Sequence, residues 1–423
     1  MSLAALPKYE SYRDSGVEWL GSVPSKWKLT RLGGLFAQRK TKVSDKEYEP
    51  LSVTKKGILK QLETAAKTND GDNRKLVKAG DFVINSRSDR KGSSGVSPLD
   101  GSVSLINIVM KPTDILPEFC NHILKSHAFV EEYYRMGHGI VADLWTTRFD
   151  EMRLILMALP SHAEQRAIAS FLDDKCEKID EAVRIKEAQI ALLRERRQIL
   201  IQEAVTRGLS PDAPMKDSGI DWIGQIPAHW DAIPLKHLFF ENTRRTLTGK
   251  ETLLSLRMHI GLVPHDDVSD KPITNADLVD YKMVEVGQLV MNRMRASIGL
   301  FGIAMQDGLV SPDYAIFDAR QDLFAPFFLS LFKMEVVGTR FRLSSRGLGT
   351  GSSGFMRLYT DDFGAISVAV PPRAEQEDIV RYIEATTNKI GGAITLKQDQ
   401  ITALKEYKSS LINAAVTGKI KVI

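Results

Sequence analysis

An internal repeat constrains the fold of this chain more than any other feature of its sequence. Three blocks from the first half recur in the second half, in the same order and at offsets of 203, 207 and 211 residues. The matching blocks are residues 14–27 with 217–230, residues 80–85 and 100–104 with 287–292 and 307–311, and residues 160–206 with 371–417. A repeated unit of about 205 to 211 residues is long enough to bury a core of its own. The sequence therefore predicts two similar domains in tandem, not a solenoid of short repeats.

Each copy ends in a segment with the periodicity of a coiled coil. In the first copy, nine of eleven positions at alternating spacings of three and four residues are apolar. Lys186 and Arg197 interrupt this seam at the places where Lys397 and Lys408 interrupt the second one. Residues 163–206 contain neither Pro nor Gly, which predicts a helix of about 66 Å. The predicted apolar seam residues are Ile168, Leu172, Ile179, Val183, Ile190, Leu193 and Leu200, with Ile379, Ile383, Ile390, Ile394, Ile401, Leu404 and Leu411.

The segments ahead of the two helices have a different pattern. Short β-rich runs alternate with Gly, Ser, Pro and Asp, as in strands joined by turns. Helices are predicted at equivalent places, over residues 117–136 and 325–341. The predicted class is α+β: two similar α/β heads separated by a pair of long helices, which a pseudo-two-fold axis would make antiparallel. The predicted segments are residues 1–158 (first head), 159–208 (first helix), 209–369 (second head) and 370–423 (second helix).

Composition excludes several classes of protein. With 43% hydrophobic and 26% charged residues, the chain is typical of globular proteins. Its apolar runs are far shorter than the roughly 20 residues that cross a bilayer, and its start lacks the layout of a signal peptide, so we expect a cytoplasmic protein. Cys120 and Cys176 are too few for a disulfide framework or a thiolate metal site. The net charge of +4 does not by itself indicate a polyanionic partner.

With its repeated blocks in the same order in both halves, the chain resembles the specificity (S) subunit of type I restriction-modification systems. The Ile/Val-Pro-x-x-Trp sequences that end at Trp27 and Trp230 are similar to the start of that family's target recognition domains. Residues 159–168 and 370–379 resemble its Pro-Pro-x-x-Glu-Gln entry into the spacer helices, although the first copy has Ser161 as the second residue of the motif. The resemblance covers essentially the whole chain from about Asp14.

The resemblance implies a non-catalytic subunit that binds double-stranded DNA with sequence specificity. Each target recognition domain would read one half of a bipartite site, while the helices set the unread spacer and dock two methyltransferase (M) subunits. Restriction (R) subunits, which carry the motor and the nuclease, could join the same complex. The chain itself would need no cofactor, since S-adenosylmethionine and ATP would bind to partner subunits only. The alternative is a coiled-coil adaptor or scaffold whose heads bind protein instead of DNA.

Basic and amide side chains of the heads are the predicted DNA contacts. Residues 39–91 hold 14 Lys and Arg against 8 Asp and Glu, a local excess that the overall balance conceals. Lys and Arg neutralise phosphates, and Arg, Asn and Gln read base edges. The competing interpretation is a solvated loop with ordinary surface charge. The candidates are Asn85, Arg87, Arg90, Lys91, Ser93 and Ser94 in the first head and Arg244, Arg245, Asn292, Arg293, Arg295, Arg346, Ser352, Ser353 and Arg357 in the second.

Catalytic motifs are absent from the sequence. It has neither the Gly-x-x-x-x-Gly-Lys-Ser/Thr phosphate loop nor the Asn/Asp-Pro-Pro-Tyr/Phe motif of amino-methyltransferases. Asp313 and Asp318 weakly resemble the carboxylates of a nuclease, but the usual Lys is missing. His122 and His127 lack a third ligand nearby, so no metal site is predicted. A cryptic nuclease would require metal-dependent cutting of DNA by this chain alone.

Overall fold

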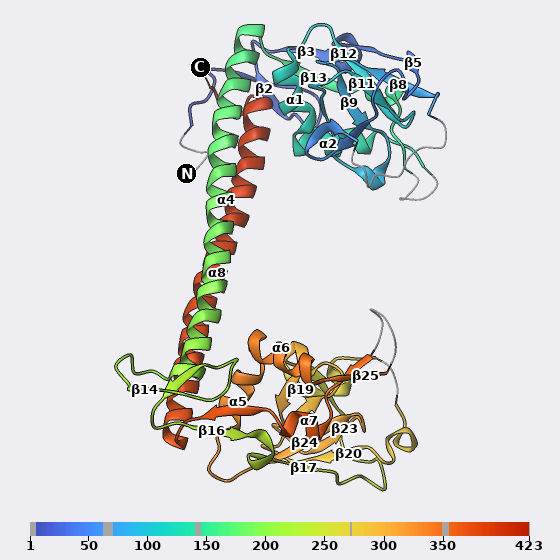
Figure 1. The fold of residues 1–423 in the computed structure, drawn as a ribbon. Helices are drawn as coiled ribbons and strands as arrows, with labels where there is room; N and C mark the ends of the chain where they lie inside the picture. Colours follow the sequence, from blue (N-terminus) through green and yellow to red (C-terminus); the bar gives the residue numbers. More distant parts are fainter. Residues whose placement is uncertain (1–5, 62–70, 140–144, 271–272, 349–354, 423) are drawn as a thin grey trace. The chain divides into compact units, whose positions relative to one another are not determined.

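The computed structural model describes residues 6–61, 71–139, 145–270, 273–348 and 355–422. The chain forms two compact units, residues 1–187 with 397–423, and residues 188–396. Each unit contains one head, the start of the long helix that follows this head, and the end of the other long helix (Figure 1). The boundary between the units therefore falls within both helices, whereas the sequence suggested four consecutive segments.

The head of the first unit is built on antiparallel strands. Its four-stranded sheet has the order β10-β9-β12-β4, and β11-β8-β5 form a second sheet; β13 pairs with β3, β6 with β7 and β1 with β2. The elements are β1 (Tyr12–Asp14), β2 (Ser22–Pro24), β3 (Lys28–Arg31), β4 (Phe36–Gln38), β5 (Lys42–Val43), β6 (Leu51–Thr54), β7 (Gly57–Lys60), β8 (Arg74–Val77), β9 (Phe82–Asn85), β10 (Ser94–Val96), β11 (Gly101–Val103), β12 (Asn107–Pro112), α1 (Pro117–Lys125), α2 (His127–Arg135), α3 (Phe149–Met152), β13 (Leu156–Leu159) and the long helix α4 (His162–Arg207).

The head of the second unit repeats this topology. Its four-stranded sheet β22-β21-β24-β17 corresponds strand by strand to β10-β9-β12-β4, and β27 pairs with β16 as β13 does with β3. The elements are β14 (Met215–Asp217), β15 (Gln225–Pro227), β16 (Asp231–Pro234), β17 (Phe239–Asn242), β18 (Leu254–Arg257), β19 (Gly261–Pro264), β20 (Lys282–Val284), β21 (Leu289–Asn292), β22 (Phe301–Ile303), β23 (Gly308–Val310), β24 (Tyr314–Ala319), α5 (Ala325–Phe332), α6 (Glu335–Ser344), β25 (Arg346–Leu348), β26 (Phe355–Arg357), α7 (Thr360–Gly364), β27 (Ser367–Val370) and the long helix α8 (Arg373–Val416). The duplication in the sequence is thus a duplication of the fold.

The helical part of each head is broken where the sequence predicted one helix. Ser126 separates α1 from α2 because its backbone is extended, with φ −61° and ψ 146°. Its hydroxyl donates a hydrogen bond to the backbone oxygen of Ile123 at 2.7 Å and accepts one from the backbone nitrogen of Phe129 at 3.3 Å. The side chain therefore ends one helix and caps the next. An extended Met334 makes the corresponding break between α5 and α6.

Each head has its own hydrophobic core, which the end of a long helix completes. Trp27 and Trp230, from the repeated Pro-x-x-Trp motif, are fully buried in the two cores. Residues from the end of α8 and just beyond it, among them Leu411 and Val416, belong to the core of the first unit. Val205, near the end of α4, belongs to the core of the second. Each core is thus built from residues of both sequence copies.

The repeated motifs form the joint between each head and its helix. The indole nitrogen of Trp27 donates a hydrogen bond to Glu164 at 3.2 Å, and that of Trp230 donates to Glu375 at 3.0 Å. In the first unit the Tyr9 hydroxyl also donates to Glu164, at 2.6 Å. The Pro-x-x-Trp motif and the Glu of the Glu-Gln pair are therefore partners in the folded chain.

The Gln of the Glu-Gln pair is the second half of this joint. Gln165 accepts a hydrogen bond from the backbone nitrogen of Leu116 at 2.9 Å and donates one to the backbone oxygen of Pro160 at 3.0 Å. Gln376 makes the same two bonds in the second unit, to Phe324 at 2.8 Å and to Pro371 at 2.8 Å. Both Gln side chains are buried, so their amides satisfy backbone groups that water does not reach.

The two long helices pair in antiparallel fashion in each unit (Figure 1). In the first unit, Lys186 donates to the Gln400 side chain at 2.7 Å and Lys408 donates to both carboxylate oxygens of Asp180 at 2.7 Å, so numbers rise along one helix as they fall along the other. Eleven of the fourteen predicted apolar seam positions are buried and three are half-buried, and exposed residues alternate with them along both helices. The buried ones are Ile168, Leu172, Ile179, Val183, Ile190, Ile379, Ile383, Ile390, Ile394, Ile401 and Leu411, and the half-buried ones are Leu193, Leu200 and Leu404. The structure confirms the predicted α+β class with two similar heads and a pair of long helices.

Candidate nucleic-acid interface

In both heads, the central strand of the four-stranded sheet ends in an asparagine that shapes the next loop. The Asn85 side-chain oxygen accepts a hydrogen bond from the backbone nitrogen of Arg87 at 3.0 Å. The Asn292 side-chain oxygen accepts bonds from the backbone nitrogens of Met294 and Arg295 at 3.0 and 3.1 Å. Both asparagines are buried, with 5% and 8% of their surface exposed. They fold the loops from inside, and we leave them out of the proposed contact surface.

The loop after β9 presents basic side chains on its outer side. Arg87 and Arg90 are exposed, whereas Ser93 and Ser94 are buried. Lys91 forms an ion pair with Glu131 at 2.6 Å and lies 5.6 Å above the centre of the Tyr134 ring. Of the six residues predicted in this head, the two arginines are therefore the ones best placed to meet a polyanion.

A second segment of the first head supports this loop. The backbone nitrogen of Ser88 donates to the oxygen of Trp145 at 3.0 Å, and that of Thr147 donates to Ser86 at 3.0 Å. The Tyr134 hydroxyl donates to the backbone oxygen of Arg87 at 3.0 Å. These bonds hold the backbone around Arg87, so its guanidinium projects from a fixed base. Sequence patterns did not reveal this support.

In the second head, Arg293 points into the protein instead of toward solvent. Its guanidinium donates to Glu241 at 2.6 Å and to the Thr360 hydroxyl at 3.1 Å, and only 18% of the side chain is exposed. Lys282, with 3% of its side chain exposed, is the second cation bound to Glu241, at 3.1 Å. Burial opposes ionisation of Glu241, but hydrogen bonds from Thr360 and Lys282 and the charge of Arg293 lower its pKa. Arg293 thus belongs to an internal network, and it is not a candidate for base reading.

Other basic residues remain at the surface near this loop. Arg295 is exposed. Arg346 and Arg357 are cross-strand partners in the β25–β26 hairpin, where they form ion pairs with Asp362 at 2.5 Å and Asp313 at 2.6 Å. The backbone nitrogen of the next residue, Leu358, donates to the oxygen of Arg293 at 2.9 Å, which places the hairpin's base beside the loop. The predicted candidates Ser352 and Ser353 lie outside the described residues.

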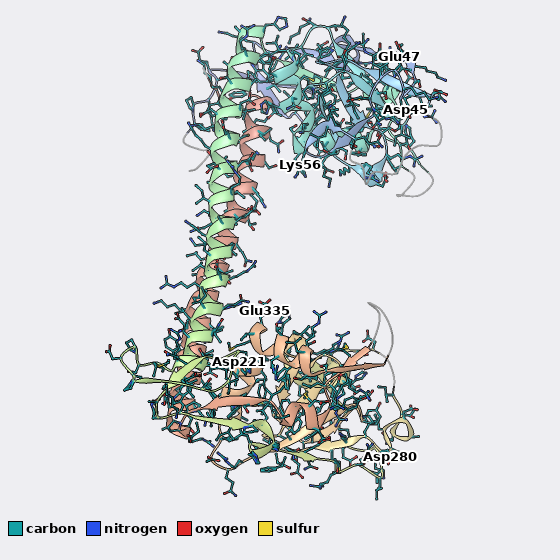
Figure 2. All side chains as sticks on the ribbon, in the orientation of Figure 1. Asp45, Glu47, Lys56, Asp221, Asp280 and Glu335 are labelled. Carbon is teal, nitrogen blue, oxygen red and sulfur yellow. The ribbon has the colours of Figure 1, made fainter. Side chains whose placement is uncertain are left out.

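Arg244 and Arg245 follow the edge strand β17, and both are exposed. Arg244 forms an ion pair with Glu285 at 2.5 Å, and Arg245 donates to the backbone oxygen of Asp280 at 2.6 Å. Figure 2 labels Asp280 in the second head. At the offset of 203, Arg245 corresponds to Lys42 of the first head. Both positions pair with equivalent lysines of the next strand.

Two lysines of the first head extend the list of candidates. Lys40 and Lys42 are exposed after β4; at the offset of 203, Lys42 is the counterpart of Arg245, whereas Lys40 corresponds to Thr243. Sequence analysis missed both as candidates, although the repeat at an offset of 203 could have found Lys42 through Arg245. Burial, and then the charge of Lys40, lower the pKa of the neighbouring Lys75. Lys75 is also the cross-strand partner of Lys42 between β5 and β8, so lysines lie side by side along this edge.

No constellation of catalytic groups accompanies these loops in the described residues. Asp313 pairs with Arg357, whereas Asp318 accepts hydrogen bonds from Gln288 at 2.7 Å and Asn242 at 3.3 Å, so the two carboxylates have separate partners. Among the residues that the structure describes, no group of three or more His, Cys, Asp and Glu could hold a metal ion. Within the same ranges, no helix is both long and apolar enough to cross a membrane.

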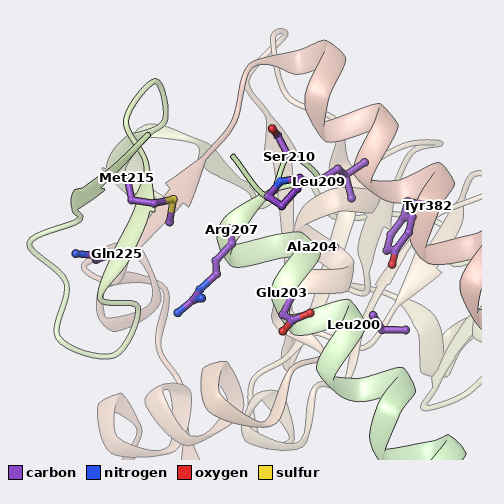
Figure 3. Close-up of a pocket in the computed structure, with 11 residues that line it drawn as sticks. Leu200, Glu203, Ala204, Arg207, Leu209, Ser210, Met215, Gln225 and Tyr382 are labelled. Atoms are coloured by element: carbon purple, nitrogen blue, oxygen red, sulfur yellow. The ribbon is translucent and has the colours of Figure 1, made fainter. Parts of the chain in front are cut away.

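A pocket of about 600 Å³ lies at the end of α4 (Figure 3). Leu200, Glu203 and Arg207 of α4 line it together with Met215 and with Tyr382 of α8. None of the predicted DNA-contacting residues lines this pocket. It lies at the joint between the end of α4 and the second head.

Comparison with solved structures places the fold. A chain from a structure on complex assembly and conformational transition of the type I R-M system matches with a TM-score of 0.69 at 14% identity, over 93% of this chain and 98% of that chain. The HsdS subunit from Thermoanaerobacter tengcongensis matches with a TM-score of 0.57 at 16% identity, over 96% of this chain and 100% of its own. The chain therefore has the fold of type I specificity subunits. No protein-family model and no curated protein matches the sequence.

Proposed function

We propose that this chain is the non-catalytic, sequence-specific DNA-binding subunit of a cytoplasmic type I restriction-modification complex. Each head reads one half of a bipartite double-stranded site. The paired helices set the unread spacer and dock two methyltransferase subunits, to which restriction subunits can be added. S-adenosylmethionine and ATP bind to those partners.

The observation that carries the proposal is the match between the two loops. Each loop follows an equivalent buried strand, β9 or β21, and is shaped by an equivalent asparagine. Each also carries exposed arginines at its surface: Arg87 and Arg90 in one head, Arg295 in the other. Two equivalent basic loops in one chain suit a site with two separate halves. The loops differ in sequence, as expected if the two half-sites differ.

Selection from a pool of randomised duplexes tests the proposal. The chain, combined with methyltransferase subunits of its own system, should enrich two short motifs at a fixed separation. Affinity for the selected duplex should fall steeply as salt rises, because phosphate contacts release counterions. An adaptor that binds only protein would enrich no motif and show no such salt dependence.

Substitutions confined to one loop assign the half-sites. Arg87→Ala with Arg90→Ala should relax selection of one motif only, and Arg295→Ala that of the other, each at a cost of about 1 to 3 kcal/mol per lost base contact. Lys216→Ala is the matched control, because Lys216 is exposed on β14 and belongs to neither loop. Loss of both motifs on changing one head would contradict independent reading.

A further inference from the structure

Leu192 and Ile199 are exposed aliphatic side chains on α4, whereas most large apolar side chains of this helix are buried or half-buried. Leu192 is 64% exposed and Ile199 is 47% exposed. Each follows a seam position, Ile190 or Arg197, by two residues. Two residues turn an α-helix by about 200°, so Leu192 and Ile199 lie on a face directed away from α8. We call this face the α4 stripe.

The spacing of the α4 stripe indicates what covers it. Leu192 and Ile199 are seven residues apart, which is the repeat of a coiled-coil seam. Arg196 lies on the same face, four residues after Leu192 and three before Ile199; it is exposed and forms no ion pair among the described residues. The complementary surface is an amphipathic helix with apolar residues at heptad spacing and an acidic residue opposite Arg196.

The second copy does not reproduce this face. At the offset of 211, Leu192 and Ile199 correspond to Ala403 and Ser410 on α8, which are exposed. Arg196 corresponds to Tyr407, which packs against the core of the first unit. One heptad earlier the copies agree, because Ile185 and Leu396 are both apolar and exposed. The chain thus offers two equivalent helix faces of unequal apolar area.

We propose that the α4 stripe binds an amphipathic helix of one methyltransferase subunit tightly, and that the equivalent face of α8 binds the second subunit more weakly. The inference rests on the proposed function and adds an order of assembly to it. Burying two half-exposed aliphatic side chains strengthens binding about thirtyfold over Ala and Ser at the same positions. At limiting methyltransferase, a complex with one such subunit therefore accumulates, with the α4 stripe occupied.

Titration of the full chain with methyltransferase subunits of its own system, followed by native mass spectrometry, tests the order. The wild type should bind two copies in two resolved steps. Leu192→Ala with Ile199→Ser should weaken the first step about thirtyfold and make the steps alike. Ala403→Leu with Ser410→Ile should strengthen the second step instead. Leu247→Ala, which removes a side chain 86% exposed in the second head, is the matched control and should change neither step.

Titration results other than the expected ones lead to different conclusions about the inference and about the proposed function. Two equal steps that neither double variant alters would overturn the inference and leave the proposed function standing. A wild type that binds no methyltransferase subunit would overturn the proposed function itself. Dimers of the chain alone that Leu192→Ala with Ile199→Ser abolishes would show that a second copy covers the stripe, against the inference. Helix content from circular dichroism checks that each variant is folded.

Discussion

Replacing Gly391 and Gly392 by alanine should stabilise α8. Both glycines lie inside this helix, next to the buried seam residue Ile390 and ahead of Ile394. A Cβ atom added at either position meets no heavy atom within 4 Å. The change therefore adds no clash, and it removes the conformational freedom that a glycine loses when a helix forms.

The size of the effect follows from helix propensity. In a helix interior, glycine is about 0.8 to 1.0 kcal/mol less favourable than alanine. Two substitutions without steric cost should stabilise this part of α8 by about 2 kcal/mol, which is a factor of about 30 in the opening equilibrium. The equivalent residues of α4 are Asp180 and Glu181, so the first copy already has side chains at these positions.

Hydrogen exchange resolved to peptides measures this effect where it arises. Amides around residues 390–396 should exchange up to about thirtyfold more slowly in the double variant, while those of the heads stay unchanged. Ala385→Gly is the converse control, because Ala385 is exposed within the same helix and its loss should cost about 1 kcal/mol. Unchanged or faster exchange in the alanine variant would refute the reasoning, since it would mean that the glycines do not limit helix stability.

Three further substitutions test the joint, the internal network and the helix pair. Gln165→Leu should destabilise the first unit by about 2 to 3 kcal/mol in urea denaturation, because the backbone nitrogen of Leu116 and the backbone oxygen of Pro160 lose their buried hydrogen-bond partner. Gln198→Leu, at an exposed position of α4, is the control and should cost far less stability. Glu241→Gln should destabilise the second unit by about 2 kcal/mol at pH 7. Since the pKa of Glu241 is lowered from 4.5, its contribution is present above that value and is lost as pH falls through the folded pKa, so the stability curves of variant and wild type should converge once pH falls below the folded pKa. Lys408→Ala removes the ion pair with Asp180 and should cost only about 0.5 kcal/mol of stability, because 60% of the Asp180 side chain is exposed. A loss above about 2 kcal/mol in the same denaturation assay would show that this ion pair is stronger than an ordinary surface pair.

The sequence predicted the parts of the fold that depend on local or repeated patterns. The heptad spacing located the first long helix to within a residue at each end and placed the second within the predicted residues 370–423, because a helix that buries one face must repeat apolar residues along it. The break at Ser126 was missed, since the apolar pattern continues through it while the side chain caps the backbone. The two-fold repeat also located the loops after β9 and β21.

The direction of single side chains on those loops depends on residues far away in the sequence. Arg293 corresponds to Ser86 of the first head, and it turns inward because Glu241 lies opposite it. The first head has Gln38 at the place of Glu241, so the same strand pair carries no such charge. The pairing joins residues 52 apart in the chain. A loop rich in arginine therefore indicates a basic surface without showing which arginine forms it.

The comparison of the two copies separates residues that hold the fold from residues free to change. Trp27 and Trp230 make the same bond to the first acidic residue of their helix, and both Gln residues of the Glu-Gln pairs bridge the same two backbone groups. The surface loops after β9 and β21 share only the buried asparagine that folds them. Because the joint is independent of the loop side chains, substitutions in a loop can change what a head binds without loosening the head from its helix. A duplicated chain built in this way can acquire two different recognition surfaces while both copies keep one common attachment.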